Sequence, residues 1–187
     1  MPRQKPIWWQ YTVQAALRFA DPWAVKYVEP AFSGNPDAAF TLACALGNAR
    51  RGAVAVAMWD TKVPRPAFRV FLESAWEHDH GYVIDAAGTR RRLAAMFRYA
   101  AFPLPDWIEE AVRVWRGTSG VSVNRARTGY SWTLNRDMAC WFAMRFHGPA
   151  RKPLVLVAEV PRGEIFADCG RWPLLVRERR ASDASVR

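Results

Sequence analysis

Residues 112–159, VRVWRGTSGVSVNRARTGYSWTLNRDMACWFAMRFHGPARKPLVLVAE, decide the fold of this chain. They contain a short apolar strand that carries an arginine (VWRG, 114–117) and a second extended stretch (GYSWT, 129–133). The near-continuous apolar run at 153–160 is typical of a strand buried in the middle of a sheet. Before that run, Asn135 is placed to cap a helix. The order of these segments predicts an α/β core.

The second extended stretch has two faces, because successive side chains of a strand point to opposite sides. Ser131 and Thr133 therefore share one face, and Trp132 is expected to point into the core. On the helix that follows, Met138 and Phe142 fall at helical spacing and are predicted to belong to a core stripe.

The amino-terminal half has a helical pattern. Asn35 can cap a helix that should end at Gly47. The stretches AFRVFLESAWEHDH (67–80) and TRRRLAAMFRYAAF (89–102) are typical of amphipathic helices. The apolar residues 52–60 (GAVAVAMWD) fit either a strand or a buried helix.

Each predicted helix has one apolar face. The residues expected there are Phe40, Ala43 and Cys44 in the first helix, Phe68, Phe71, Leu72, Ala75 and Trp76 in the second, and Leu93, Met96, Phe97 and Ala100 in the third. The basic residues of the third helix are Arg90, Arg91, Arg92 and Arg98. They form either a solvated basic face or a phosphate-binding face. The sequence has no linear ribbon of alternating basic and aromatic residues of the kind that binds single strands.

Pro103 and Pro105 separate this helical pattern from the strands that follow. The predicted fold class is α+β, with a mainly helical part at 1–105 and a mixed-sheet α/β core at 106–187. Asp106, with Glu109 three residues later, has the spacing of a capping box and predicts a short helix at the start of the core.

Composition limits the partners and the compartment. Lys and Arg number 27 against 17 Asp and Glu, and the net charge of +10 favours contact with anions. Cys44, Cys140 and Cys169 are odd in number and widely spaced, which fits a reducing cytoplasm. His78 and His80 lack a third ligand at suitable spacing, so no metal site is predicted. We expect no signal peptide and no membrane partner.

Three motifs, taken in order, resemble an ADP-ribosyltransferase of the arginine–serine–glutamate (cholera-toxin-like) class. The motifs are Arg116-Gly117-Thr118, Ser131-Trp132-Thr133 and Ala139-Cys140-Trp141-Phe142-Ala143. That class has an arginine on its first core strand, a Ser-x-Ser/Thr on the next, an aromatic helix, and a catalytic glutamate on a late strand. The resemblance covers only the carboxy-terminal part and implies an ADP-ribosyltransferase-like core there, with NAD as substrate.

The resemblance implies roles for these residues. Arg116 would hold phosphate or ribose oxygens of NAD, a task suited to a bidentate guanidinium. Gly117 would let the backbone approach the nicotinamide amide, with Thr118 beside it. Ser131 would brace the site and order the catalytic glutamate, and Thr133 would support the same wall. One aromatic ring of the helix, Trp141 or Phe142, would face the nicotinamide, although both also fit a core stripe.

The catalytic carboxylate departs from the family pattern. The family glutamate stands before an apolar run, usually as the second acid of a pair, whereas residues 174–176 (LLV) precede Glu178 here. Glu178 is the first candidate, with Asp168 and Glu164 as alternatives. A missing acid, and therefore a degenerate site, is a further possibility. Position 176 is valine, so the paired acid that usually marks arginine modification is absent.

These observations predict a mono-ADP-ribosyltransferase of the bacterial or phage effector or toxin type. It would transfer ADP-ribose from NAD to a macromolecular acceptor, a protein or a nucleic acid, and would be an NAD glycohydrolase if water replaced the acceptor. One alternative is a catalytically degenerate module that binds NAD or a protein. Another is a basic nucleic-acid-binding protein, which the charge of +10 and residues 90–92 suggest.

Overall fold

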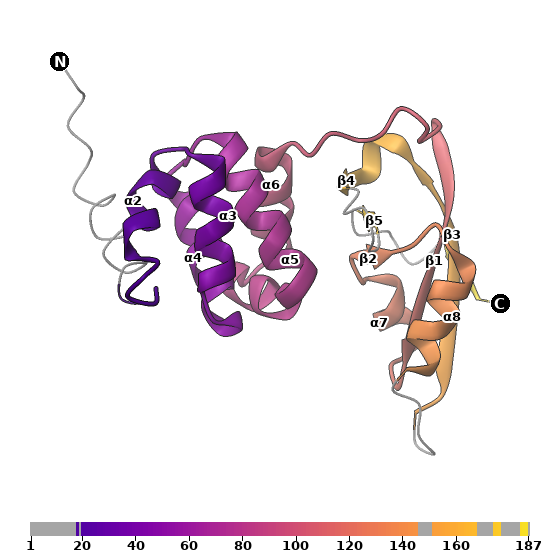
Figure 1. The fold of residues 1–187 in the computed structure, drawn as a ribbon. Coiled ribbons are helices and arrows are strands. Elements are labelled where there is room, and N and C mark those ends of the chain that lie inside the picture. The colour runs from indigo at the N-terminus through magenta and orange to yellow at the C-terminus, as the bar shows by residue number, and fades with distance from the viewer. Residues whose placement is uncertain (1–17, 19, 146–150, 168–173, 177–183, 187) are drawn as a thin grey trace. The chain divides into compact units, whose positions relative to one another are not determined.

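The structure, a computed structural model, describes residues 18, 20–145, 151–167, 174–176 and 184–186 of the 187-residue chain. The chain divides into two compact units, Met1–Ala101 and Phe102–Arg187. The division falls close to the boundary expected at 105. The described elements of the first unit are helices, and those of the second are strands and helices, so the chain is a mixed α+β protein (Figure 1).

The first unit is built around one long helix, α5 (Arg65–Ala87). Three other helices pack against it or follow it: α3 (Pro36–Ala45), α4 (Asn48–Asp60) and α6 (Arg90–Ala100). A shorter helix, α2 (Val25–Phe32), packs on α3. Although α5 has 23 residues, none of the helices in the described part of the chain is both long enough and apolar enough to cross a bilayer.

The predicted helix starts in this unit are confirmed. The Asn35 side chain accepts a hydrogen bond from the Ala38 N–H at 3.0 Å, and the Thr89 hydroxyl accepts one from the Arg92 N–H at 3.2 Å. The ambiguous residues 52–60 lie in α4 and are therefore helical. The second predicted helix does not end at residue 80. It continues to Ala87, because the left-handed conformation that closes it is adopted at Gly88, with φ 69°.

The buried faces of α5 and α6 are as expected, whereas in α3 only Ala43 of the three expected residues is buried. Phe40 is 54% exposed and Cys44 is also exposed. The helix instead buries the small residues around Leu42, which is fully buried. The physical reason is that α3 packs against both α2 and α5, so its contact faces are set by two neighbours and not by one apolar stripe.

The second unit contains two small sheets. One has the order β1-β3-β6, from β1 (Ala111–Ser119), β3 (Pro153–Pro161) and β6 (Ala184–Val186). The other has the order β2-β5-β4, from β2 (Ser131–Trp132), β5 (Leu174–Val176) and β4 (Ile165–Ala167). The strand pairs that the structure describes are all antiparallel, so the prediction of a mixed sheet is wrong.

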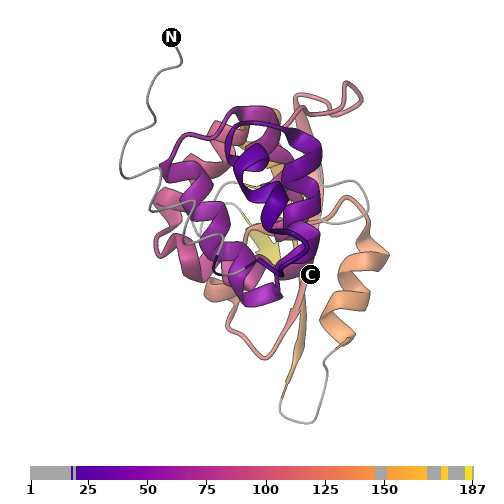
Figure 2. The ribbon, with the colours of Figure 1, turned by 60° about the vertical axis from the view of Figure 1, so that its left-hand side comes forward.

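The core of this unit lies on one face of β1 and β3. Trp132, which is 1% exposed, points into it as expected. The core consists of Ile108, Val114, Ala126, Trp132, Leu156, Ala158, Val160 and Ile165. A short helix, α7 (Val123–Arg127), supplies Ala126, and a second helix, α8 (Arg136–Met144), packs along β1. Both views show α8, the orange helix, beside the β1–β3 ladder (Figure 1, Figure 2).

The helix predicted from Asp106 and Glu109 does not form. This segment is held by Arg162, the first residue of the 3₁₀ turn η1 (Arg162–Glu164) that precedes β4. The Arg162 guanidinium donates hydrogen bonds to the carbonyls of Leu104, Pro105 and Ile108, and its backbone N–H donates to the Glu110 carbonyl at 2.8 Å. Two of these acceptors, the carbonyls of Ile108 and Glu110, are ones that the predicted helix would have used.

Candidate functional site

Arg116 lies on β1 and reaches across to the neighbouring strand. Its Nη1 donates a hydrogen bond to the backbone carbonyl of Ser131, the first residue of β2, at 2.6 Å. The backbones of the two stretches are joined at the residue before Arg116, because Trp115 and Thr133 exchange both backbone hydrogen bonds, at 2.7 and 2.8 Å. The arginine strand and the Ser-x-Thr stretch, predicted from separate parts of the sequence, are therefore neighbours.

Gly129 makes room for the Arg116 side chain. A Cβ atom built on Gly129 would overlap the Arg116 Cζ, Nη2 and Nε atoms. The backbone therefore lies flat against the guanidinium, and any larger residue at 129 would displace it. Sequence analysis assigned no role to Gly129. The signal in the sequence is the glycine two residues before Ser131, but its meaning depends on a contact with a residue 13 positions earlier in the chain (129 − 116 = 13).

The Arg116 guanidinium is buried, and no acid among the described residues neutralises its charge. Arg116 Nε is buried and has no hydrogen-bond partner, and among the described residues no carboxylate lies within ion-pair distance of this side chain. Burial lowers the pKa of Arg116 to about 10, so the group still carries its charge at neutral pH. A buried cation without a counterion attracts an anion, because pairing recovers part of the desolvation cost.

Gly117 contributes a backbone edge and a close helix contact. In an antiparallel strand, alternate residues direct their N–H and C=O to the same side. Trp115 directs its own toward Thr133, so Gly117 directs its N–H and C=O to the same edge, two residues further along β1. A Cβ on Gly117 would overlap the Ala139 carbonyl of α8, so this glycine also lets α8 approach β1 closely.

The remaining predicted binding residues do not converge on the guanidinium as directly. The Thr133 hydroxyl accepts a hydrogen bond from the Asn135 N–H at 3.1 Å, at the start of α8. Thr118 lies near the end of β1 and is partly buried. Trp141 is 49% exposed on α8, and its ring meets that of Phe142 edge-on at 5.0 Å.

The helix α8, which carries Trp141 and Phe142, and the Arg116 side chain lie on opposite faces of β1. The buried residues of α8 are Ala139 and Ala143, which face Gly117, whereas the Arg116 side chain points to the opposite face of the strand. Met138 and Phe142, which were predicted to form the core stripe of α8, are half-buried. The fully buried positions are the small residues Ala139 and Ala143, because the helix approaches the strand closely at Gly117.

The candidate acids are only partly described. Glu164 ends the turn η1 and is half-buried, directly before β4. Strand β4 pairs with β5, and β5 pairs with β2 at Ser131. Asp168 and Glu178 lie outside the described residues, as does Cys169. Along the sequence, Asp168 directly follows β4 and Glu178 comes two positions after the last residue of β5.

Two further polar residues border the site and were not expected from the sequence. Arg127 and Tyr130 flank Gly129, and the Arg127 Nε and the Tyr130 hydroxyl are both buried. The RAR motif at 125–127 gave no sign of this, because its burial depends on the packing of α7.

The chain matches no protein-family model, no curated protein and no solved structure. Its function must therefore be argued from the residues around Arg116. These residues offer a buried positive charge, the backbone N–H and C=O of Gly117 on one edge of β1, and a serine on the adjoining strand. Such a set of groups suits a ligand that carries both phosphate and amide groups.

Proposed function

We propose that the chain is an NAD-dependent mono-ADP-ribosyltransferase that transfers ADP-ribose to a macromolecular acceptor. The observation that supports this proposal is the buried guanidinium of Arg116, which is bonded to Ser131 on the adjoining strand and has no carboxylate at ion-pair distance among the described residues. The resemblance of the motifs gives the order of these residues its chemical meaning. NAD supplies what the site lacks, namely a pyrophosphate anion that can neutralise the guanidinium.

The proposed binding mode assigns each group of the ligand a partner. Arg116 holds the pyrophosphate or a ribose oxygen through the guanidinium nitrogens that are not bonded to Ser131. The N–H and C=O of Gly117 pair with the nicotinamide carboxamide, which has one acceptor and two donors. Ser131 and Thr133 line the same wall. Thr118, Trp141 and Phe142 remain candidates for outer contacts with the dinucleotide.

The proposed reaction breaks the bond between the nicotinamide nitrogen and the ribose C1′. Nicotinamide leaves as a neutral molecule with the bonding electron pair, and positive charge develops on the ribose. A carboxylate near the sugar stabilises that charge, and Glu178 is the proposed group. A nucleophile of the acceptor then bonds to C1′ and loses its proton. Water in place of the acceptor gives free ADP-ribose.

The test is incubation of the full chain with NAD labelled in its adenylate part, together with a cell lysate. We expect NAD to be consumed and a macromolecule to be labelled. Arg116→Lys should lower both rates more than tenfold, because an ammonium cannot reproduce the two-pronged guanidinium contact. Arg113→Lys, an exposed position on the same strand, is the matched control and should not change them. If the wild-type chain neither consumes NAD nor labels an acceptor, the proposal fails.

A second function, NAD binding without turnover, is favoured by one observation. In the described part of the chain, the guanidinium has no acid within ion-pair distance. Titration calorimetry of NAD into the wild-type chain, with Glu178→Gln and Glu164→Gln alongside, separates the two functions. Heat of binding without NAD loss in all three proteins supports the binding module. NAD loss that disappears in one variant supports the transferase and names its acid.

A further inference from the structure

A cluster of basic and aromatic side chains lies on the helical unit, whereas the residues that the proposed transferase uses belong to the other unit. It consists of Trp59, Lys62, Arg65, Arg92 and Tyr99, and we name it the basic–aromatic cluster. The Lys62 ammonium lies 4.2 Å from the centre of the Trp59 ring and 5.5 Å from that of Tyr99. Arg92 lies 5.4 Å from the Trp59 ring, and Arg65 lies 5.6 Å from the Tyr99 ring.

The two rings are held in place by the fold. The Tyr99 hydroxyl donates a hydrogen bond to the Val63 carbonyl at 2.8 Å, and its ring packs on Phe68, with 5.5 Å between the ring centres. Trp59 is half-buried in the last turn of α4. Lys62 stands between the rings because the chain turns there with φ 54°, directly after α4. The rings are therefore a fixed surface, and the exposed cations around them are the mobile part.

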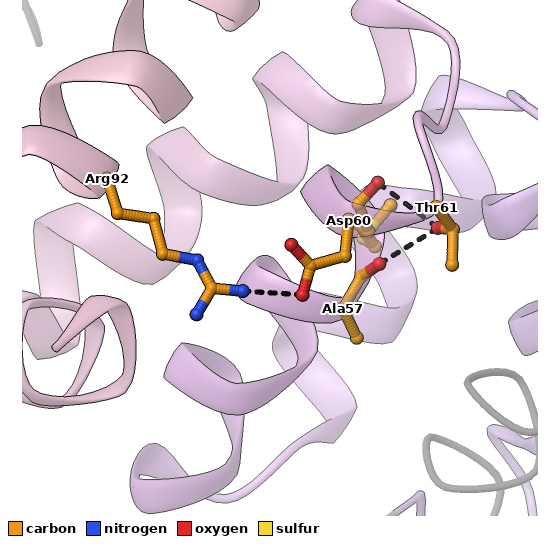
Figure 3. A network of polar contacts seen from close by, with 5 residues as sticks. Ala57, Asp60, Thr61 and Arg92 are labelled. Carbon is orange, nitrogen blue, oxygen red and sulfur yellow. Dashed lines mark hydrogen bonds and ion pairs between the residues drawn. The ribbon is translucent and has the colours of Figure 1, made fainter. Parts of the chain in front are cut away.

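Most of the positive charge in the cluster is not neutralised. Lys62 and Arg65 are exposed, and within the described residues neither has a carboxylate at ion-pair distance. Arg92 does have one: its Nη2 lies 2.5 Å from the Asp60 Oδ2, as Figure 3 shows, and both side chains are partly exposed. The same figure shows the Thr61 hydroxyl bonded to the Ala57 carbonyl, which closes α4 beside this ion pair. The cluster thus holds three cations and one acid.

Fixed aromatic rings among exposed cations suit one class of partner better than others. A single-stranded nucleic acid presents phosphates to the cations and unpaired bases to the rings. A duplex presents the phosphates but hides the base faces, and an acidic peptide presents charge without planar rings to stack. The cations now lying over Trp59 and Tyr99 can move to phosphates while bases take their places over the rings.

We propose that the basic–aromatic cluster is a binding surface for single-stranded nucleic acid. The sequence did not reveal it, since residues 59, 62, 65, 92 and 99 come from α4, the turn after it, α5 and α6, and only packing gathers them. The neighbouring exposed Arg91 extends the positive surface along α6. Because this surface is separate from Arg116, the inference does not depend on the proposed transferase activity.

The experiment measures binding of fluorescein-labelled oligothymidylate and oligouridylate to the full chain by anisotropy, over a series of salt concentrations. Lys62→Asn/Arg65→Gln removes two charges, and asparagine tolerates the left-handed conformation at position 62. We expect this variant to lower the slope of log affinity against log salt by about 1.4, that is about 0.7 for each lost phosphate contact. The matched control is Arg125→Gln/Arg136→Gln, which removes two exposed charges from the other unit and should leave the slope unchanged.

Two further variants keep the test independent of folding losses. Trp59→Leu should weaken binding roughly 5- to 100-fold through the loss of base stacking. Asp60→Asn frees Arg92 and should strengthen binding by roughly 1.5- to 5-fold, a gain that a misfolded chain cannot give.

Three results would overturn the proposal. The first is an equal loss of slope in the control variant, which would mean that net charge alone attracts the oligonucleotide. The second is equal affinity for the matching duplex. The third is displacement of the oligonucleotide by polyglutamate at an equal concentration of charge. Preference between the DNA and RNA probes identifies which single strand is the partner.

Discussion

Arg116 carries its positive charge in a buried position, where charge is unfavourable, and the effect on stability can be measured. A buried cation without a counterion costs stability, whereas an apolar residue of similar length does not. We predict that Arg116→Met leaves the free energy of unfolding of the second unit equal or higher, by up to about 3 kcal/mol, while NAD binding is lost. Denaturant unfolding followed by tryptophan fluorescence, with calorimetry of NAD binding, tests both halves. A loss of more than about 2 kcal/mol would mean that Arg116 is a structural cation.

The burial of this charge also fixes the sign of the pH dependence. The pKa of Arg116 is lowered to about 10 by burial, so the unfolded chain binds this proton more tightly than the folded chain. The penalty is constant below about pH 10, and stability from this group rises as pH increases above about 10. In Arg116→Met that rise should disappear. Anion binding should follow the opposite course and weaken above about pH 10, as the guanidinium loses its charge.

Gly129 gives a second test at the scale of one residue. A methyl group there would overlap the Arg116 guanidinium, so Gly129→Ala must push it away from the Ser131 carbonyl. We predict at least a tenfold loss of NAD affinity, with about 1–3 kcal/mol of destabilisation from overpacking. Gly163→Ala is the control, because its Cβ would meet open space in the same unit. If the affinity for NAD is unchanged in Gly129→Ala, the Arg116 guanidinium does not bind NAD.

At the scale of elements, the contact between α4 and α5 depends on one glycine. A Cβ on Gly52 of α4 would overlap the Tyr82 carbonyl of α5, a backbone atom that cannot turn aside. We predict that Gly52→Ala costs about 1–3 kcal/mol or more. Gly81, next to Tyr82 on the exposed side of α5, has open space, and Gly81→Ala should gain about 0.5–1 kcal/mol by favouring the helix. Thermal unfolding compares the two variants, and destabilisation of equal size in both would contradict the role given to Gly52.

The elements that local chemistry determines were predictable from the sequence. Asn35 and Asn135 cap α3 and α8 through side-chain oxygens, and the strand of Arg116 forms where its apolar residues placed it. What failed depends on contacts between distant residues. Arg162 removed the predicted helix at Asp106 by taking its carbonyls, and α8 buried alanines because Gly117 lets it approach β1.

The candidate site was predictable in the same limited way. The order of Arg116, Ser131 and Thr133 was visible in the sequence, and their strands are neighbours. Gly129 could not be found, because its role is a contact across strands. The basic–aromatic cluster could not be found either, because it joins three helices and a turn whose residues are separated by up to 40 positions in the sequence (99 − 59 = 40).

At the scale of the whole molecule, the two proposed surfaces belong to different units, so they should act independently. Mutations at distant sites without shared partners usually have additive effects. We predict that Lys62→Asn/Arg65→Gln leaves NAD hydrolysis without acceptor unchanged, and that Arg116→Lys leaves oligothymidylate affinity unchanged. The test measures NAD hydrolysis and oligothymidylate affinity in both variants. A change in either crossed measurement would show that the two units are coupled.

The same pair of variants also tells which acceptor the proposed transferase uses. If nucleic acid is the acceptor, loss of the basic–aromatic cluster should lower transfer to an oligonucleotide in proportion to the lost affinity, while hydrolysis by water continues at the wild-type rate. If the acceptor is a protein, transfer should be unchanged in the same variant. The net charge of +10 favours encounter with the oligonucleotide at low salt in both cases, so transfer must be compared near physiological ionic strength, where this general attraction is screened. Only the specific contacts of Lys62 and Arg65 then separate the two outcomes.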